Sequence, residues 1–235
     1  MSKVVGLDGC PGGWIAAVAE DGRLACFEFH KTARAALDAY PDAAIFAFDI
    51  PIGLSKDGVR AADTAARRFL HGRASSVFNS PPRLVLDIAV NARGTGRSRA
   101  DAYAEANLET RRVSGRGLSS QSYALAAKIA DVDQVAGNLR VYEAHPEVTF
   151  AELAGSRVPP SKKTWDGLMQ RRALLSAQGL AIPDVVGEVS ARCAADDVVD
   201  AVACAWTADR IARGMARSFP DPPELIDGRK VAIWC

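Results

Sequence analysis

The sequence has no hydrophobic run that approaches the roughly 18 residues needed to cross a bilayer. Its 235 residues are 49% hydrophobic and 24% charged, which is ordinary for a globular protein. The first residues lead straight into an apolar block and lack the basic stretch and apolar core of a secretory signal peptide. From these absences we expect a cytoplasmic protein with no membrane partner.

Several common functional motifs are also absent. The five cysteines are odd in number, and their spacing matches neither metal ligands nor a redox pair. There is no P-loop, no HExxH motif and no GxSxG motif. The short stretch Gly94-Thr95-Gly96 lacks the third glycine of a dinucleotide fingerprint and does not follow a predicted strand.

The charge is nearly balanced overall but unevenly distributed. The formal net charge is +1, yet the segment from Lys56 to Lys128 holds 13 basic and 6 acidic residues, a balance of +7. The other residues hold 16 basic and 22 acidic side chains, a balance of −6. A basic segment on an acidic core suits a polyanion such as nucleic acid. Arginines that merely cover solvated helices would give the same count.

The N-terminal 49 residues predict an α/β protein whose opening elements have a particular order. Asp21-Gly22 is a strong signal for a two-residue hairpin turn. The predicted elements are a strand at 4–8, a hairpin of strands at 14–20 and 23–30, a helix at 31–40 and a strand at 43–49. This order resembles the opening of the ribonuclease H-like fold, and also of each half of the actin-like ATPases.

The remaining residues favour helices with one further strand. Residues 52–138 have helical composition between Gly-, Ser- and Pro-rich connectors, and we interpret them as a basic helical insertion within a single domain, 1–235. A short strand is predicted at 140–143, helices at about 146–154 and 165–178, and a last long helix from about Ala195.

Acidic residues at the ends of the predicted strands suggest a metal site. Asp8 and Asp49 each end an apolar strand, where open α/β folds keep their sites, and Glu143 ends the next strand in the same way. Asp197 and Asp200 are three residues apart, so both project from one face of the last helix.

Several carboxylates close together repel one another, and a hard divalent cation such as Mg²⁺ or Mn²⁺ would neutralise them. Two such ions roughly 4 Å apart would activate water and stabilise the leaving oxygen of a phosphodiester. The alternative is that Asp197 caps its helix and Asp200 is solvated.

Three other stretches could belong to the site. Lys162 and Lys163 precede a helix start, where a bound phosphate would offset their unfavourable interaction with the helix dipole, although a solvated loop is an equal alternative. His145 could act as a general acid or base, but a strand-to-helix junction of this kind more often caps a helix. The stretch Arg73–Arg83 combines hydroxyls, arginines and Phe78, and could line a substrate groove.

Seven sequence blocks carry a resemblance to a known family. In chain order they are GLDGCPGGW, FDIPIGL, RASSVFNSPPR, SQSYALAAKIADVD, YEAHPEVTFAELAG, SKKT and DDVVDAVACA. Together they resemble an uncharacterised domain-of-unknown-function family labelled as predicted nuclease with a ribonuclease H-like fold. The blocks cover almost the whole chain. The nuclease label of that family itself follows from fold analogy.

Holliday-junction resolvases are more distantly similar and imply roles for particular residues. By this resemblance, Asp8 and Asp49 match acids on the first and fourth strands, and Asp197 with Asp200 matches the acidic pair of the last helix. Lys162 or Lys163 would correspond to a lysine that approaches the scissile phosphate. The chain departs from the resolvases in having Asp in place of Glu on the fourth strand, and in the long helical insertion that follows it.

The leading hypothesis is therefore a divalent-metal nuclease that acts on nucleic acid. Its metals would be held by Asp8, Asp49, Asp197 and Asp200, with Glu143 as a further ligand. One alternative is an actin-like nucleotide-binding protein or phosphotransferase, which would need a homodimer or the insertion to complete its cleft. Another is a non-catalytic module that binds nucleic acid or protein.

Overall fold

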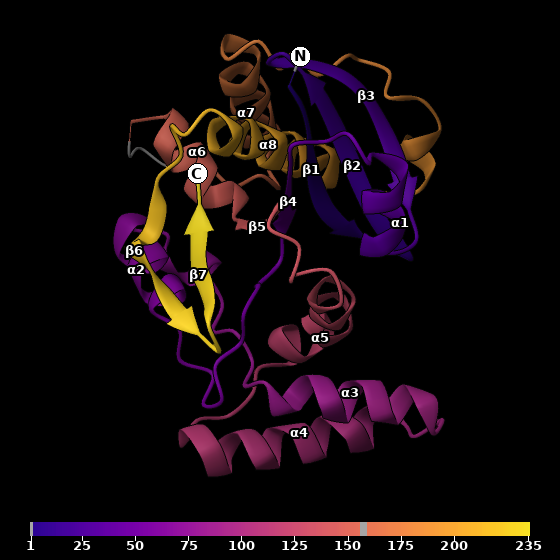
Figure 1. Cartoon of the computed structure of the whole chain (residues 1–235), viewed down its shortest axis with the longest axis vertical. Helices are drawn as coiled ribbons and strands as arrows, with labels where there is room; N and C mark the ends of the chain where they lie inside the picture. Colours follow the sequence, from indigo (N-terminus) through magenta and orange to yellow (C-terminus); the bar gives the residue numbers. More distant parts are fainter. Residues whose placement is uncertain (1, 156–158) are drawn as a thin grey trace.

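The computed structural model describes residues 2–155 and 159–235, which form a seven-stranded mixed sheet and eight α-helices (Figure 1). The strands are β1 (Lys3–Cys10), β2 (Gly13–Glu20), β3 (Arg23–His30), β4 (Ile45–Asp49), β5 (Val141–Ala144), β6 (Ser218–Ile226) and β7 (Arg229–Trp234). The helices are α1 (Ala33–Ala39), α2 (Ala61–Phe69), α3 (Leu84–Gly94), α4 (Arg99–Ser114), α5 (Ser120–Asp133), α6 (Pro146–Leu153), α7 (Trp165–Ala177) and α8 (Ala195–Ala212). Two short 3₁₀ helices are η1 (Ala74–Ser76) and η2 (Gly187–Ala191).

The strand order is β3-β2-β1-β4-β5-β7-β6. β1, β4, β5 and β7 are parallel to their neighbours in this series, whereas β1–β2, β2–β3 and β6–β7 pair antiparallel. Asp21 and Gly22 both have positive φ angles, as a two-residue hairpin turn between twisted strands requires. The hairpin, helix and strand predicted within the first 49 residues are thus confirmed.

β1 extends to Cys10, but its parallel pairing with β4 stops before Asp8. The parallel ladder between β1 and β4 ends at Leu7 opposite Phe48. β1 then pairs only with β2, up to Cys10. Asp8 and Asp49 are therefore the residues that follow the last pair between β1 and β4, at the same level along the two strands, although Asp49 still pairs with Ala144 of β5. This register places the two carboxylates beside one another at one edge of the sheet.

Alternation along the central strands supplies two cores, one on each face of the sheet. Leu7 and Phe48 point to the face covered by α1, α3 and α5. Val4 and Ala47 point to the opposite face, where α8 packs. Figure 1 shows α8 lying across β1 and β4, with α6 and α7 beside it.

Gly6 allows α8 to approach the sheet closely. A Cβ atom on Gly6 would lie 2.0 Å from the Ala205 nitrogen and 2.2 Å from the Ala201 oxygen. Only a glycine on the strand and small residues on the helix permit this contact. Asp200 directly precedes Ala201, so the same close packing brings its carboxylate to the edge of β1.

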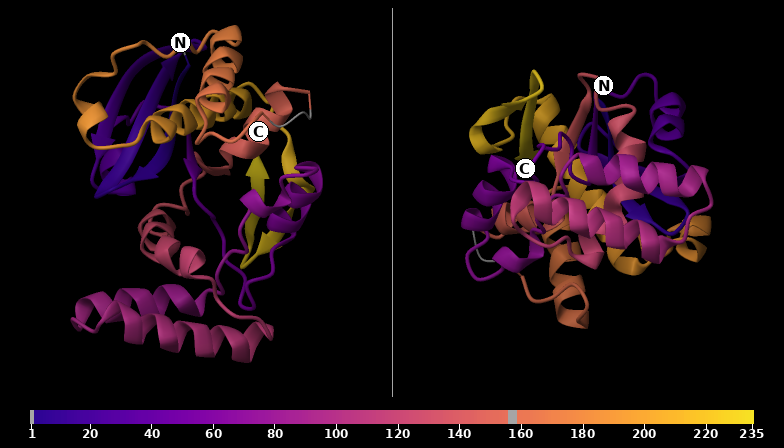
Figure 2. Two further views of the ribbon diagram at one scale, coloured as in Figure 1. Left: turned by 180° about the vertical axis from the view of Figure 1, so that it is seen from behind. Right: turned by 90° about the horizontal axis from the view of Figure 1, so that it is seen from below.

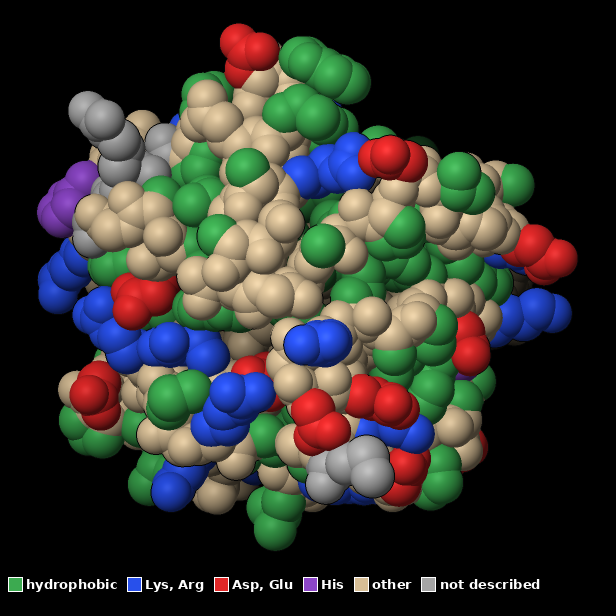
Figure 3. Space-filling view, turned by 90° about the horizontal axis from the view of Figure 1, so that it is seen from above, with side chains coloured by type: hydrophobic (Ala, Val, Ile, Leu, Met, Phe, Trp, Pro, Cys, Tyr) green, Lys and Arg blue, Asp and Glu red, His purple; other side chains and the backbone are tan. Residues whose placement is uncertain are grey.

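The predicted helical segment 52–138 contains α2, α3, α4 and α5 and lies in two places. α2 packs against the hairpin of β6 and β7, and its apolar residues share a core with them. α3 and α4 pack side by side and, with α5, form a lobe beside the sheet (Figure 2). At the end of the molecule opposite to this lobe, basic and acidic side chains lie next to one another (Figure 3).

The C-terminal hairpin was not predicted from the sequence. β6 contains Pro220, Pro222 and Pro223, and prolines argue against a strand because they cannot donate to a ladder. β6 forms the edge of the sheet, where unpaired backbone groups are tolerated, and its register is irregular between Phe219 and Glu224. β7 pairs parallel to β5 and extends the sheet beyond the predicted strands.

The longest described helix, α8, has 18 residues and carries several charged side chains. Among the described residues, no helix combines the length and the apolar character required to cross a membrane.

Candidate metal centre

Three of the predicted acidic residues meet at one edge of the sheet. Asp8 comes from β1, Asp49 from the end of β4 and Asp200 from the second turn of α8. One oxygen from each carboxylate can be chosen so that all three lie within 4.8 Å of one another. Lys162, from the loop before α7, forms an ion pair with Asp200. The structure therefore brings together four of the seven residues predicted for the site.

Burial makes this cluster electrostatically unfavourable. Asp8 is 7% exposed and Asp200 is 1% exposed. Burial, together with the charges of Asp49 and Asp200, raises the pKa of Asp8 well above its usual range. Burial also raises the pKa of Asp49 to about 6 and that of Asp200 to about 7, although Lys162 opposes both shifts. One lysine is too little positive charge for three carboxylates.

An unpaired oxygen in the cluster fits a bound cation. Asp200 Oδ1 is buried and has no hydrogen-bond partner within residues 2–155 and 159–235. Asp8 Oδ1 accepts a hydrogen bond of 2.7 Å from the Gly9 nitrogen, which fixes the orientation of that carboxylate. A buried acceptor without a donor, in a group of excess negative charge, is suited to a hard divalent cation with oxygen ligands.

Asp197 lies near this cluster but is engaged elsewhere. Its Oδ2 accepts a hydrogen bond of 2.9 Å from the Ala194 nitrogen, so its carboxylate closes the first turn of α8. Its charge is still close enough to contribute to the raised pKa of Asp8. Of the two alternatives weighed for the helical pair, Asp197 takes the capping role, whereas Asp200 is buried and not solvated.

The two lysines have different positions. Lys162 faces the carboxylates, and although burial opposes the shift, the Asp200 carboxylate raises the pKa of Lys162. Lys163 is exposed and pairs with Asp196, with 2.6 Å between Lys163 Nζ and Asp196 Oδ2. Of these two lysines, Lys162 lines the cavity in which the carboxylates lie and Lys163 does not.

A second buried ion pair holds the loop that carries Lys162. Arg171 is fully buried, and its Nη2 lies 2.7 and 2.9 Å from the two carboxylate oxygens of Glu147. Its Nη1 donates to the Pro160 oxygen, and the Thr164 hydroxyl accepts from the Gly167 nitrogen at 3.1 Å. These contacts fix the segment from Pro160 to Thr164, which carries Lys162, against α7.

Glu143 belongs to a different network. Arg60 donates to both of its carboxylate oxygens, each at 2.8 Å, and the Ile52 nitrogen donates at 2.7 Å. Arg60 also contacts Asp63 at 2.5 Å, and Asp63 Oδ2 accepts from the Ser80 nitrogen at 3.0 Å. Glu143 thus lies outside the three-carboxylate cluster, and its ion pair anchors the segments after β4 and before α3.

Arg60 was missed by reasoning from sequence. Its position three residues before Asp63 suggests an ion pair within a helix turn. Nothing in the local pattern indicates the partner Glu143, which is 83 positions away.

His145 lies at the start of α6 and lines the cavity without capping the helix through its side chain. Its Nε2 is 3.3 Å from the Ser76 oxygen, and its Nδ1 is buried without a partner in the described parts of the chain. Burial lowers the pKa of His145, so its imidazole is neutral at neutral pH.

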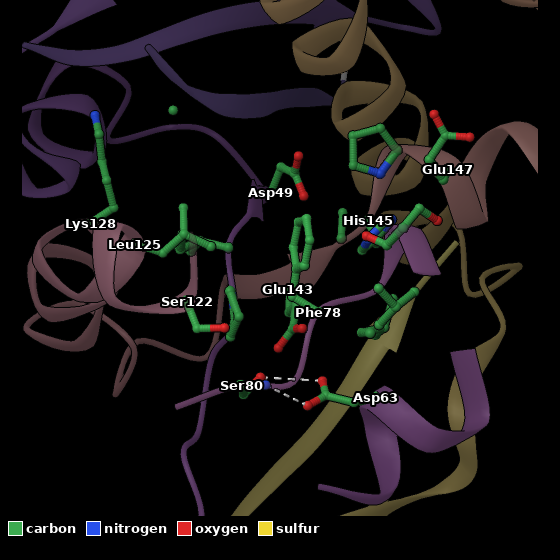
Figure 4. Close-up of a pocket in the computed structure, with 18 of the residues that line it drawn as sticks. Asp49, Asp63, Phe78, Ser80, Ser122, Leu125, Lys128, Glu143, His145 and Glu147 are labelled. Atoms are coloured by element: carbon green, nitrogen blue, oxygen red, sulfur yellow. Dashed lines mark hydrogen bonds between the residues drawn. The ribbon is translucent and has the colours of Figure 1, made fainter. Parts of the chain in front are cut away.

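A cavity of about 350 Å³ connects these groups. Asp8, Asp49, Lys162 and Asp200 line one side, and Phe78, Ser80, Ser122 and Leu125 belong to the segments opposite. Figure 4 shows Asp49 at the end of β4, Phe78 and His145 among the other lining residues, and Ser80 bound to Asp63 at the bottom of the view. The stretch Arg73–Arg83, proposed from sequence as a groove wall, contributes residues 76–81 to this cavity.

A family model described as "Protein of unknown function (DUF429)" matches residues 6–225. The chain therefore belongs to this family, and the membership of an uncharacterised family expected from the sequence blocks is confirmed. No curated protein and no solved structure matches the chain.

Proposed function

We propose that this member of the DUF429 family hydrolyses phosphodiesters in nucleic acid with the help of Mg²⁺ or Mn²⁺. The observation that carries the proposal is the cluster of Asp8, Asp49 and Asp200, whose oxygens lie within 4.8 Å of one another with too little positive charge around them. Carboxylates left in excess at the edge of a sheet, inside a cavity, are a frequent basis for metal-assisted hydrolysis.

The order of the elements supports this proposal. The series β1-β2-β3-α1-β4, with acids on β1 and β4 and another acid on the last helix, is compatible with a ribonuclease H-like arrangement. In this interpretation residues 52–138 are a helical insertion in a single domain, and β6 and β7 extend the sheet beyond it. Asp49 would replace the longer glutamate of resolvase-like enzymes.

The residues of the chain have separate tasks in this reaction. Asp8, Asp49 and Asp200 would hold the cation, which when bound activates water and polarises the phosphate. Lys162 lines the same cavity, and its ammonium group would contact a non-bridging phosphate oxygen. Its raised pKa keeps it charged at neutral pH.

Other predicted site residues take supporting roles in the proposal. Asp197 holds the first turn of α8, and Glu143 with Arg60 holds the cavity wall. Lys163 pairs with Asp196 outside the cavity. The arrangement with two cations stays a prediction.

The actin-like alternative finds less support. Such proteins form their nucleotide cleft between two repeats of the fold, whereas residues 2–155 and 159–235 contribute to one sheet. A homodimer would have to supply the second repeat. A non-catalytic module that binds nucleic acid would show binding without hydrolysis, so the following assay separates it from the nuclease.

The test is hydrolysis of labelled DNA and RNA oligonucleotides, single-stranded and duplex, with Mn²⁺ or Mg²⁺. Asp8→Asn and Asp200→Asn should abolish product formation, and Asp38→Asn, an exposed acid on α1, should leave it unchanged. Absence of hydrolysis in the unmodified protein, or equal hydrolysis by Asp8→Asn, would contradict the proposal.

A further inference from the structure

A second cavity opens next to the one that contains the carboxylates. Its volume is about 570 Å³, and it lies between residues 74–82 and the junction of α4 and α5. The two cavities share the strip Val77–Ser80 and Ser122 as a common wall. A ligand at the carboxylates therefore has a direct continuation along this strip.

Phe78 is the exposed aromatic residue of the shared wall. Its side chain is 44% exposed, although it lines both cavities. The backbone on either side is fixed, because Arg67 donates to the Val77 oxygen at 2.9 Å and to Asn79 Oδ1 at 2.7 Å. A partly exposed aromatic ring on a fixed segment is suited to stacking with a nucleobase.

The second cavity has a positive charge balance. Arg67 and Arg116 line it, and neither forms an ion pair within the described chain. Arg67 binds only neutral acceptors, so its charge is not cancelled. Asp57 is the one acidic residue in the lining. This balance contrasts with the acidic first cavity and would attract a phosphate.

The shape of the first cavity limits what can reach the carboxylates. Asp8 and Asp200 are almost fully buried at one side of a space of about 350 Å³, which is the size of a small-molecule site. A nucleotide that has left its base stack fits such a space, whereas a base-paired duplex does not.

We infer that the two cavities bind consecutive nucleotides of a single-stranded nucleic acid. This inference rests on the proposed function, since it assigns the substrate class of the same site. One base stacks on Phe78, a flanking phosphate lies near Arg67 and Arg116, and the neighbouring phosphate reaches the carboxylates. The preference for a single strand follows from the narrow access to the acids and from the stacking platform.

The test is fluorescence anisotropy with labelled single-stranded DNA, single-stranded RNA and duplex oligonucleotides in EDTA, where no cation supports hydrolysis. Phe78→Ala should weaken single-strand binding about tenfold, because stacking contributes roughly 1 to 3 kcal/mol per base. Phe78→Trp, which keeps an aromatic ring, should retain single-strand binding. Leu108→Ala removes an apolar side chain of similar exposure outside both cavities and should have no effect.

The salt dependence supplies a second measurement. Arg116→Gln should reduce the slope of log Kd against log salt concentration by about 0.7, the value for one lost phosphate contact with a single strand. Arg23→Gln, which makes the same change in net charge on β3, should leave the slope unchanged.

Binding and hydrolysis are measured separately, so the two proposals can fail separately. Tight single-strand binding that depends on Phe78, without hydrolysis in Mn²⁺, would retain this inference and remove the proposed reaction. Hydrolysis that depends on Asp8, with equal binding by Phe78→Ala or equally tight duplex binding, would overturn the inference alone.

Discussion

Glu143 and Asp49 lie on neighbouring parallel strands, yet their carboxylates belong to two buried charge groups of different character. Around Glu143, Arg60 and the Ile52 nitrogen satisfy both carboxylate oxygens at 2.7 to 2.8 Å. Among the described residues around Asp49, Lys162 forms an ion pair with Asp200 but with neither Asp8 nor Asp49, and Asp200 Oδ1 has no donor.

The difference separates a structural ion pair from a candidate binding site. Burying a charge is costly unless it is paired and hydrogen-bonded, and the group around Arg60 meets that condition without any ligand. The group around Asp49 meets it only if protons or a cation neutralise the acids. A fold that retains such a group carries a cost that a bound cation would remove.

Removing Arg60 should have the largest effect on stability. Arg60→Met leaves Glu143 and Asp63 buried without their cation, and breaking a buried pair in this way costs about 3 to 5 kcal/mol. Urea unfolding would measure the loss. Arg68→Met, at an exposed position on α2, the helix that begins directly after Arg60, is the matched control and should change stability little. Similar stability of the two variants would remove the distinction between the charge groups.

Asp8→Asn should have the opposite effect and raise the stability of the folded protein. The folded-state pKa of Asp8 is raised, so ionisation of this group in the folded protein is unfavourable and stability falls as the pH rises above about 4. The variant should match the unmodified protein near pH 3.5, below the unfolded-state pKa of about 3.9, and should be more stable than it at pH 8.

Urea unfolding in EDTA at the two pH values would measure this gain. In a separate measurement without EDTA, Mn²⁺ should raise the stability of the unmodified protein at pH 8 and leave the stability of Asp8→Asn unchanged. A variant that is less stable than the unmodified protein at pH 8 would identify Asp8 as a structural partner.

The two adjacent lysines sharpen the comparison further. Lys162→Gln removes the cation that faces the carboxylates and should lower the rate of hydrolysis about tenfold, the size of a lost charged contact of about 1.4 kcal/mol. Lys163→Gln removes an exposed charge paired with Asp196 and should change the rate less than twofold. Equal effects of both changes would argue against a specific phosphate contact by Lys162.

Local patterns were sufficient to predict the N-terminal half of the sheet. Apolar strands, the Asp21-Gly22 turn and the acids after the parallel ladder can be identified from neighbouring residues. The positions of Asp8 and Asp49 follow from strand register, and that of Asp200 from the small residues that let α8 approach Gly6.

Contacts over long sequence separations could not be predicted. By contrast, the hydrogen bond from the Ala194 nitrogen to Asp197 is local, and a capping role for Asp197 was one of the two alternatives that the sequence left open. The ion pair of Arg60 and Glu143 has no local signal. The hairpin of β6 and β7 was missed because its prolines oppose a strand, except at a sheet edge.

Isothermal titration of the metal-free protein with Mn²⁺ and Mg²⁺ tests the central claim most directly. We expect binding in the unmodified protein that is lost in both Asp8→Asn and Asp200→Asn. We expect it to be retained in Asp197→Asn, where the cap is weakened but the three ligands remain. No binding in the unmodified protein, or undiminished binding in Asp8→Asn and Asp200→Asn, would contradict the assignment of the cluster as a metal site.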